Sequence, residues 1–223
     1  MKVLVVEDEI ELNKLIYNLL MKEKFMVNTV FNYKDAFRQL IDYNFDVIIL
    51  DIGLPDGNGL NLLNDIKINH PDSSIIIISA KNSLDDKLAG LDKGADDYLT
   101  KPFHLSELIS RIRAIIRRKN FEGKNIFQFN ELKIDIQSNA VYINNIELKL
   151  TKKEFQLLLY FISNKNRMIT KDAVAEHLWG DNIDFVDNYD FIYTHIRNLR
   201  KKLTEAGCND YIKTIYGLGY KFG

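Results

Sequence analysis

Four polar groups suited to phosphoryl transfer follow apolar segments in the first half of this 223-residue chain. In chain order they are Glu7-Asp8 after Val3–Val6, Asp51 after Val47–Leu50, Ser79 after Ile75–Ile78, and Lys101 beyond Tyr98-Leu99. Segments that are apolar at every position are typical of strands buried on both faces of a parallel sheet, and such sheets bind ligands beyond the carboxyl ends of their strands. We therefore expect these side chains to lie together in one site.

The residue types in this set indicate an aspartate that is transiently phosphorylated. Clustered carboxylates repel one another unless a hard divalent cation neutralises them, so we predict that Glu7 and Asp8 hold Mg2+ together with Asp51. Asp51, at the end of the expected central strand, is placed to attack phosphorus and form an acyl phosphate. Lys101 would offer positive charge to the phosphoryl oxygens, and Ser79 a hydroxyl donor.

Apolar strands alternate with segments of helical period over residues 1–118, which predicts a doubly wound α/β domain with a five-stranded parallel sheet. Residues 119–125 are interpreted as a short linker, and residues 126–223 as a second domain. The expected apolar helix faces of the first domain comprise Leu12, Leu15, Ile16 and Leu19, then Ala36, Phe37, Leu40 and Ile41, and finally Leu105, Leu108, Ile109, Ile112 and Ile116.

The second domain is predicted to be an α+β winged helix. Short alternating segments indicate antiparallel strands, followed by three helices and a closing hairpin. Thr151 is expected to cap the first helix in a capping box with Glu154. The strands are expected near Phe127–Phe129, Leu132–Ile136, Val141–Ile143 and Glu147–Leu150, the second helix from Thr170-Lys171 to Trp179-Gly180, the third from Asn188 to Leu203, and the hairpin at Tyr211–Ile215 and Tyr220–Phe222.

The third helix of this domain carries a polar, basic face that suits the major groove of double-stranded DNA. Its side chains offer base-edge donors, a methyl group for thymine and phosphate partners, although an isolated charge run is more often a solvated helix surface. The candidates are Tyr189, Tyr193, Thr194, Arg197, Asn198, Arg200, Lys201 and Lys202, while Ile192, Ile196, Leu199 and Leu203 are expected to face the core.

The composition excludes bulk basicity as the basis of DNA binding. The formal net charge is -1, with 16 Lys and Arg against 18 Asp and Glu in residues 1–119 and 14 against 13 in the remainder. Any DNA contact must therefore come from local clusters. The single cysteine, Cys208, fits a reducing cytoplasm, and the apolar run after Met1-Lys2 stops at Glu7, so we expect neither a signal peptide nor a membrane span.

Several segments carry motifs that can be compared with a known family. They are Asp51–Gly57, Ser79–Lys81 and Gly94–Phe103 in the first half, and Leu150–Phe155, Leu178–Gly180, His195–Leu203 and Gly217–Tyr220 in the second. These segments resemble the receiver domain and the winged-helix output domain of bacterial two-component response regulators of the OmpR/PhoB group, over essentially the whole chain. The resemblance implies a non-enzymatic cytoplasmic transcription regulator that a sensor histidine kinase phosphorylates on Asp51, with tandem DNA half-sites and RNA polymerase as further partners.

The resemblance also implies how phosphorylation acts. The Lys101-Pro102 bond would be cis, which aims Lys101 inward, and the backbone carbonyl of Gly53 would be a metal ligand. A phosphoryl group would draw Ser79 inward and let Tyr98 rotate toward the core. The face of the fourth helix, fifth strand and fifth helix would then form a symmetric homodimer, with Lys87 matching Glu107 and Asp97 matching Arg111.

This chain departs from the family pattern at some positions. Gly53 is smaller than the usual side chain, so the lifetime of the acyl phosphate stays open. Asp190 stands where many relatives have a basic residue, and Asn198 where Arg is common. Tyr216 precedes the wing where Arg is frequent, and its ring either packs within the hairpin or meets the sugar-phosphate backbone.

Two other functions remain open at the level of sequence. One is a Mg-dependent phosphohydrolase with an aspartyl-phosphate intermediate, although hydrolases of the haloacid-dehalogenase type need an acid two residues beyond the nucleophile, where this chain has Gly53. The other is a receiver that dimerises without phosphorylation.

Overall fold

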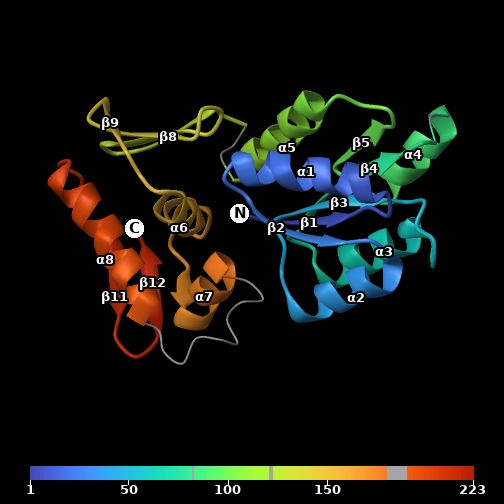
Figure 1. Ribbon diagram of the computed structural model, residues 1–223. Coiled ribbons are helices and arrows are strands. Elements are labelled where there is room, and N and C mark those ends of the chain that lie inside the picture. Colours follow the sequence, from blue (N-terminus) through green and yellow to red (C-terminus); the bar gives the residue numbers. More distant parts are fainter. Residues whose placement is uncertain (82, 121–122, 180–189) are drawn as a thin grey trace. The chain divides into compact units, whose positions relative to one another are not determined.

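The chain folds into two units, Met1–Ile115 and Ile116–Gly223, in a computed structural model (Figure 1). The structure describes residues 1–81, 83–120, 123–179 and 190–223. One helix, α5 (Leu105–Asn120), crosses the division, so positions 119 and 120 of the expected linker are helical. Positions 121 and 122 of that linker lie outside the described residues.

The first unit is a parallel sheet with helices on both faces, as the sequence predicts. Its strands pair in the order β2-β1-β3-β4-β5, and every pairing is parallel. Its elements are β1 (Lys2–Val6), α1 (Ile10–Lys22), β2 (Met26–Val30), α2 (Tyr33–Asp42), β3 (Val47–Asp51), α3 (Gly59–Asn69), β4 (Ser74–Ser79), α4 (Leu84–Asp92), β5 (Asp97–Thr100) and α5.

Uninterrupted apolar strands form the centre of this unit. Every residue of β1, β3 and β4 is buried, as expected for strands that are covered on both faces. Helices α1 and α5 lie on one face of the sheet, and α2 and α3 on the other (Figure 1). Because the strands are parallel, the carboxyl ends of β1, β3, β4 and β5 lie along one edge of the sheet.

Helices α1 and α2 bury less of their apolar faces than the sequence period predicts. Ile16 is fully buried, but Leu15 is exposed. Phe37 and Ile41 are 42% and 70% exposed, and with Ile66 of α3 they line a surface cavity of about 250 Å3. The stripe of each helix that contacts the sheet is therefore narrower than its run of apolar residues.

The second unit contains two antiparallel sheets and three helices among its described residues. One sheet has the order β6-β7-β8-β9 and the other the order β10-β12-β11. Its elements are β6 (Ile126–Phe129), β7 (Leu132–Asp135), β8 (Ala140–Ile143), β9 (Ile146–Leu148), α6 (Lys152–Ser163), β10 (Met168–Thr170), α7 (Lys171–Trp179), α8 (Asp190–Glu205), β11 (Ile212–Ile215) and β12 (Gly219–Phe222).

Local signals in the sequence account for most of these elements. Thr151 and Glu154 form the predicted capping box of α6, and the Thr170 hydroxyl accepts the N–H of Ala173 at the start of α7. The sequence does not predict strand β10, which is three residues long and extends the closing hairpin to three strands. The expected start of α8 at Asn188 and the expected end of α7 at Gly180 lie outside the described residues.

Candidate functional site

Carboxylates from two neighbouring strands meet at the carboxyl edge of the parallel sheet. Glu7 directly follows β1, Asp51 ends β3, and these strands pair with Val6 opposite Leu50. Glu7, Asp8 and Asp51 each offer a carboxylate oxygen, and these oxygens all lie within 4.8 Å of one another. Glu7 and Asp51 are buried, whereas Asp8 is exposed.

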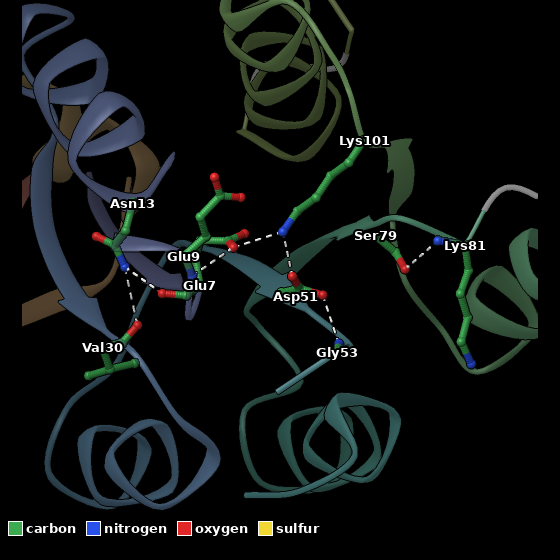
Figure 2. A network of polar contacts seen from close by, with 9 residues as sticks. All are labelled: Glu7, Glu9, Asn13, Val30, Asp51, Gly53, Ser79, Lys81 and Lys101. Atoms are coloured by element: carbon green, nitrogen blue, oxygen red, sulfur yellow. Dashed lines mark hydrogen bonds and ion pairs between the residues drawn. The ribbon is translucent and has the colours of Figure 1, made fainter. Parts of the chain in front are cut away.

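Lys101 places its ammonium group between the two buried carboxylates. Its Nζ lies 2.7 Å from Glu7 Oε1 and 2.5 Å from Asp51 Oδ2 (Figure 2). The Lys101-Pro102 bond is cis, as the resemblance implies, and the Lys101 N–H donates to the Ser79 carbonyl at 2.7 Å. The structure thus brings the expected lysine to the expected aspartate.

One cation here serves two buried carboxylates. Burial raises the pKa of Glu7 above its ordinary value of 4.5, and the hydrogen bond and charge of Lys101 oppose this shift only in part. Burial lowers the pKa of Lys101, but its bonds to Asp51 and Glu7 raise it more, so the pKa stays above 10.5. With Asp8 beside them, these carboxylates carry more negative charge than Lys101 neutralises.

The carboxylate oxygens that remain suit a hard cation. Glu7 Oε1 accepts hydrogen bonds from Lys101 and from the Glu9 N–H, but Glu7 Oε2 is buried and has no hydrogen-bond partner among the described residues. Asp51 Oδ1 accepts the N–H of Gly53 at 2.7 Å. A buried, unpaired carboxylate oxygen is costly unless an ion binds it, so the acidic cluster fits a divalent cation with oxygen ligands.

A buried asparagine that sequence reasoning missed supports this edge of the sheet. The Asn13 side chain donates to the carbonyls of Glu7, at 2.9 Å, and Val30, at 3.3 Å (Figure 2). It thereby ties the end of β1 to helix α1 and to β2. The only signal in the sequence is an amide within an apolar helical period, a pattern that solvent-facing positions of amphipathic helices also show.

Ser79 and Tyr98 lie beside this site on β4 and β5. Ser79 is buried, and its hydroxyl accepts the N–H of Lys81 at 3.1 Å (Figure 2). The Tyr98 ring is only 8% exposed, and its hydroxyl donates to the Lys81 carbonyl at 3.0 Å. Tyr98 therefore points inward in this structure. The resemblance implies the same position for the phosphorylated protein, so Tyr98 need not rotate from its present position to adopt it.

The four residues expected at a dimer face are half-buried, and one of them, Arg111, contacts two of the others within one chain. Arg111 binds both carboxylate oxygens of Asp97, at 2.8 and 2.9 Å, and Glu107 Oε1 at 2.8 Å. Lys87 lies on α4, where Leu84, Leu88 and Leu91 are exposed. Any pairing of Asp97 with Arg111 across a dimer would replace or share the contact within the chain.

Helix α8 presents the polar face that its sequence predicts. Its four expected core residues, Ile192, Ile196, Leu199 and Leu203, are buried. Tyr193, Thr194, Arg197 and Asn198 are all exposed, whereas Tyr189 lies outside the described residues.

Two expected phosphate contacts of α8 have partners within the chain. Arg200 forms a two-pronged ion pair with Asp210, which holds its guanidinium group toward the turn after the helix. Lys201 lies 3.7 Å from Glu205, in an exposed pair that water readily screens. Lys201 is therefore the more available of the two cations.

The tip of the β11–β12 hairpin projects fully into solvent. Tyr216 is 99% exposed, so the expectation that its ring packs within the hairpin is wrong. Gly217 in the same turn has a φ of +76°, a conformation that favours glycine. The remaining expectation, a contact of Tyr216 with the DNA backbone, is compatible with this exposure.

Comparisons with known proteins agree with this geometry. Residues 3–113 match the family model described as "Response regulator receiver domain", and residues 145–222 match "Transcriptional regulatory protein, C terminal". The chain is 39% identical over 219 residues to Response regulator ArlR of Staphylococcus aureus, covering 98% of both proteins.

The solved structures that resemble this chain include response regulators. The response regulator DrrB, described as a Thermotoga maritima OmpR/PhoB homolog, matches with a TM-score of 0.50 and 31% identity, over 99% of this chain and 98% of that one. A two-component response regulator from Clostridium difficile matches over 54% of this chain and 98% of its own, with a TM-score of 0.52 and 28% identity.

A receiver unit followed by a winged-helix unit is the organisation of a response regulator that acts on DNA. The chain belongs to the OmpR/PhoB family of response regulators and is a phosphorylation-regulated, DNA-binding transcriptional regulator. Neither family model describes a phosphohydrolase, so the matches favour the regulator over that alternative. Within the described part of the chain, no helix is long and apolar enough to cross a membrane.

Proposed function

We propose that Asp51 accepts a phosphoryl group from the phosphohistidine of a sensor kinase. A carboxylate oxygen of Asp51 attacks phosphorus, a P–O bond forms as the P–N bond breaks, and the leaving imidazole nitrogen keeps the bonding electron pair. The observation that carries this proposal is the contact of 2.5 Å between Lys101 Nζ and the buried Asp51 carboxylate, beside two further carboxylates. Lys101 would then bind the phosphoryl oxygens, with the Ser79 hydroxyl as a second donor.

The ligands we propose for Mg2+ are the carboxylates of Glu7, Asp8 and Asp51 and the backbone carbonyl of Gly53. When bound, this ion would neutralise negative charge on the carboxylates and the phosphoryl oxygens. The unpaired Glu7 Oε2 supports the assignment. Water would later attack phosphorus and release inorganic phosphate, so the chain removes its own modification without turning over an external substrate.

The output of the switch is proposed to be a symmetric homodimer through α4, β5 and α5. Exposed leucines on α4 offer apolar area for such a contact, and Lys87, Asp97, Glu107 and Arg111 offer charges of both signs. A two-fold axis repeats each contact twice, so a small change at this face has a doubled effect on dimer stability.

The dimer would bring two winged helices to tandem half-sites on DNA in the cytoplasm. We assign Tyr193, Thr194, Arg197 and Asn198 to the major groove, Arg200 and Lys201 to phosphates, and Tyr216 to the backbone beside the wing. Linking two modules raises affinity through effective concentration, so a double site would bind far better than a single one. RNA polymerase is a further partner in this proposal.

Phosphate incorporation tests the assignment of Asp51. The intact protein is incubated with Mg2+ and a small phosphodonor, and acid-labile phosphate is measured beside that of Asp51→Asn. We expect about one phosphate per chain in the intact protein and none in the variant, because an amide is a poor nucleophile. Equal incorporation in both proteins would refute Asp51 as the acceptor.

A further inference from the structure

The loop that follows Asp51 is held at its tip by the start of helix α2. The Asp56 carboxylate accepts hydrogen bonds from the backbone N–H groups of Tyr33 and Lys34, at 2.6 and 3.1 Å. We call this pair of bonds the Asp56 clamp. The first N–H groups of a helix lack partners within the helix, and the helix dipole favours a negative charge there.

The clamp holds an ionised carboxylate. Partial loss of water raises the pKa of Asp56, but the N–H groups of Tyr33 and Lys34 lower it more, so the pKa lies below the ordinary 3.8. Hydrogen bonds from N–H groups to a charged acceptor are stronger than those between neutral groups. The clamp is therefore complete at every pH at which the protein is expected to act.

The same loop is closed tightly at its base. The Gly59 N–H donates to the Ile52 carbonyl at 3.2 Å, and a Cβ on Gly59 would lie only 2.5 Å from the Asp51 carbonyl oxygen. The two ends of the loop of residues 52–58 thus lie close together, directly beside the proposed phosphoacceptor. Because the base of the loop is fixed, a movement of Asp56 at the tip would change the backbone of the few residues between them, which include Gly53.

The side chain of Tyr33 lies against the tip of this loop. A Cβ on Gly57 would lie 2.8 Å from the ring, and the Tyr33 hydroxyl donates to Asp65 Oδ2 on α3 at 3.1 Å. Tyr33 therefore contacts the loop at Gly57 and at Asp56, and it also reaches the helix that follows the loop. These contacts hold α2, α3 and the loop in one arrangement.

Between the fixed base and the clamped tip lies Gly53, the residue that touches the acceptor. Its N–H donates to Asp51 Oδ1 at 2.7 Å, and its carbonyl is the proposed metal ligand. Glycine has wide backbone freedom, so its orientation must be set by the residues on either side. Among the residues that hold the loop around Gly53, Asp56 is the one that carries a charge.

We infer that Asp56 is a positioning residue for the phosphorylation site, because its clamp on α2 holds residues 52–58 so that Gly53 meets Asp51 and the metal ion. This inference rests on the metal site of the proposed function. If Asp56 served only to stabilise α2, its loss would lower the stability of the first unit without changing the affinity for Mg2+.

Direct measurement of Mg2+ binding to the full chain separates these roles. Titration calorimetry gives the Mg2+ dissociation constant of the intact protein, of Asp56→Ala and of Asp72→Ala. Asp72 is an exposed acid whose side chain has no ion pair or hydrogen bond among the described residues, so the two variants lose the same charge. We expect the dissociation constant to rise about threefold to tenfold in Asp56→Ala, less than the 10–100-fold typical of groups bonded directly to a metal ligand, and to stay unchanged in Asp72→Ala.

A second variant opens the clamp without touching Asp56. Gly57→Ala presses a methyl group onto the Tyr33 ring, so it should weaken Mg2+ binding in the same direction. Unchanged dissociation constants in Asp56→Ala and Gly57→Ala, or an equal rise in Asp72→Ala, would overturn the inference. Weaker Mg2+ binding in the two clamp variants, together with no phosphate on Asp51 in the intact protein, would refute the proposed phosphorylation. It would still support the role of the Asp56 clamp in metal binding.

Discussion

Removing the Lys101 ammonium should destabilise the first unit strongly, and Mg2+ should reverse the effect. Lys101→Met keeps most of the side-chain volume but leaves Glu7 and Asp51 facing each other with carboxylate oxygens within 4.8 Å. Two unit charges at that separation repel by about 3.5 kcal/mol at an effective dielectric constant of about 20. Protonation of Glu7, whose pKa burial already raises, relieves part of this repulsion.

We therefore expect a loss of about 2–4 kcal/mol at pH 7.5 without divalent ions, somewhat less than the roughly 3–5 kcal/mol for breaking a fully buried ion pair, because protonation of Glu7 relieves part of the repulsion. For a unit of this size the melting temperature should fall by roughly 8–16 °C. In excess Mg2+ the difference should shrink, because the cation replaces the missing positive charge. It should also shrink as the pH falls below the raised pKa of Glu7, because the neutral carboxyl group no longer repels Asp51.

Differential scanning calorimetry of the full chain provides the assay, with and without Mg2+. The transition of the first unit is the one that Mg2+ shifts in the intact protein. Lys81→Met is the matched control, because Lys81 is an exposed lysine on the next loop whose distance to Asp86 is 3.9 Å, and such pairs contribute at most about 1 kcal/mol. Equal melting temperatures for Lys101→Met and the intact protein in the absence of Mg2+ would refute this electrostatic reasoning.

Three further outcomes can be checked separately. Glu154→Gln should destabilise the second unit by about 1–3 kcal/mol at pH 7 in urea unfolding. Burial raises the pKa of Glu154, but the hydrogen bonds from Lys202 and Thr151 lower it more. The stability that ionised Glu154 contributes is therefore present above pH 4.5 and is lost as the pH falls through the folded pKa. Gly53→Met should lengthen the half-life of the acyl phosphate in a phosphate-release assay, because a Cβ at position 53 would lie 3.4 Å from an Asp51 carboxylate oxygen and would shield phosphorus from water. Cys208 is buried and burial raises its pKa to about 12, so iodoacetamide at pH 8 should label it only in denaturant, and rapid labelling of the folded chain would contradict this environment.

The sequence predicts an element well where every residue of that element meets the same physical requirement, such as burial on both faces of a sheet. Strands β1, β3 and β4 are buried throughout, so each is an unbroken apolar run. Strand β2 lies at the edge of the sheet, and four of its five residues are only partly buried, so it has no such run to locate it. Strand β10 has three residues, too few for a periodic signal, and depends on its pairing with β12.

Long-range contacts set the limits of prediction at the functional surfaces. The helical period correctly separates the buried and exposed faces of α8, but it gives no information on the ion pair of Arg200 with Asp210, which lies beyond the end of the helix. The exposure of Phe37 and Ile41 likewise depends on how α3 packs beside α2. Asp56 is polar, exposed and in a loop, so its role becomes visible only when α2 is in place.

The control of DNA affinity in the second unit by one carboxylate of the first, Asp51, is the centre of the proposed function. It is tested most directly by titrating DNA that carries two half-sites with the intact protein and with Asp51→Asn, each before and after treatment with Mg2+ and a small phosphodonor. We expect treatment to raise the affinity of the intact protein by at least about tenfold, through dimerisation and effective concentration, and to leave Asp51→Asn unchanged. The same affinity before and after complete phosphorylation of the intact protein, or an equal increase in Asp51→Asn, would contradict the claim.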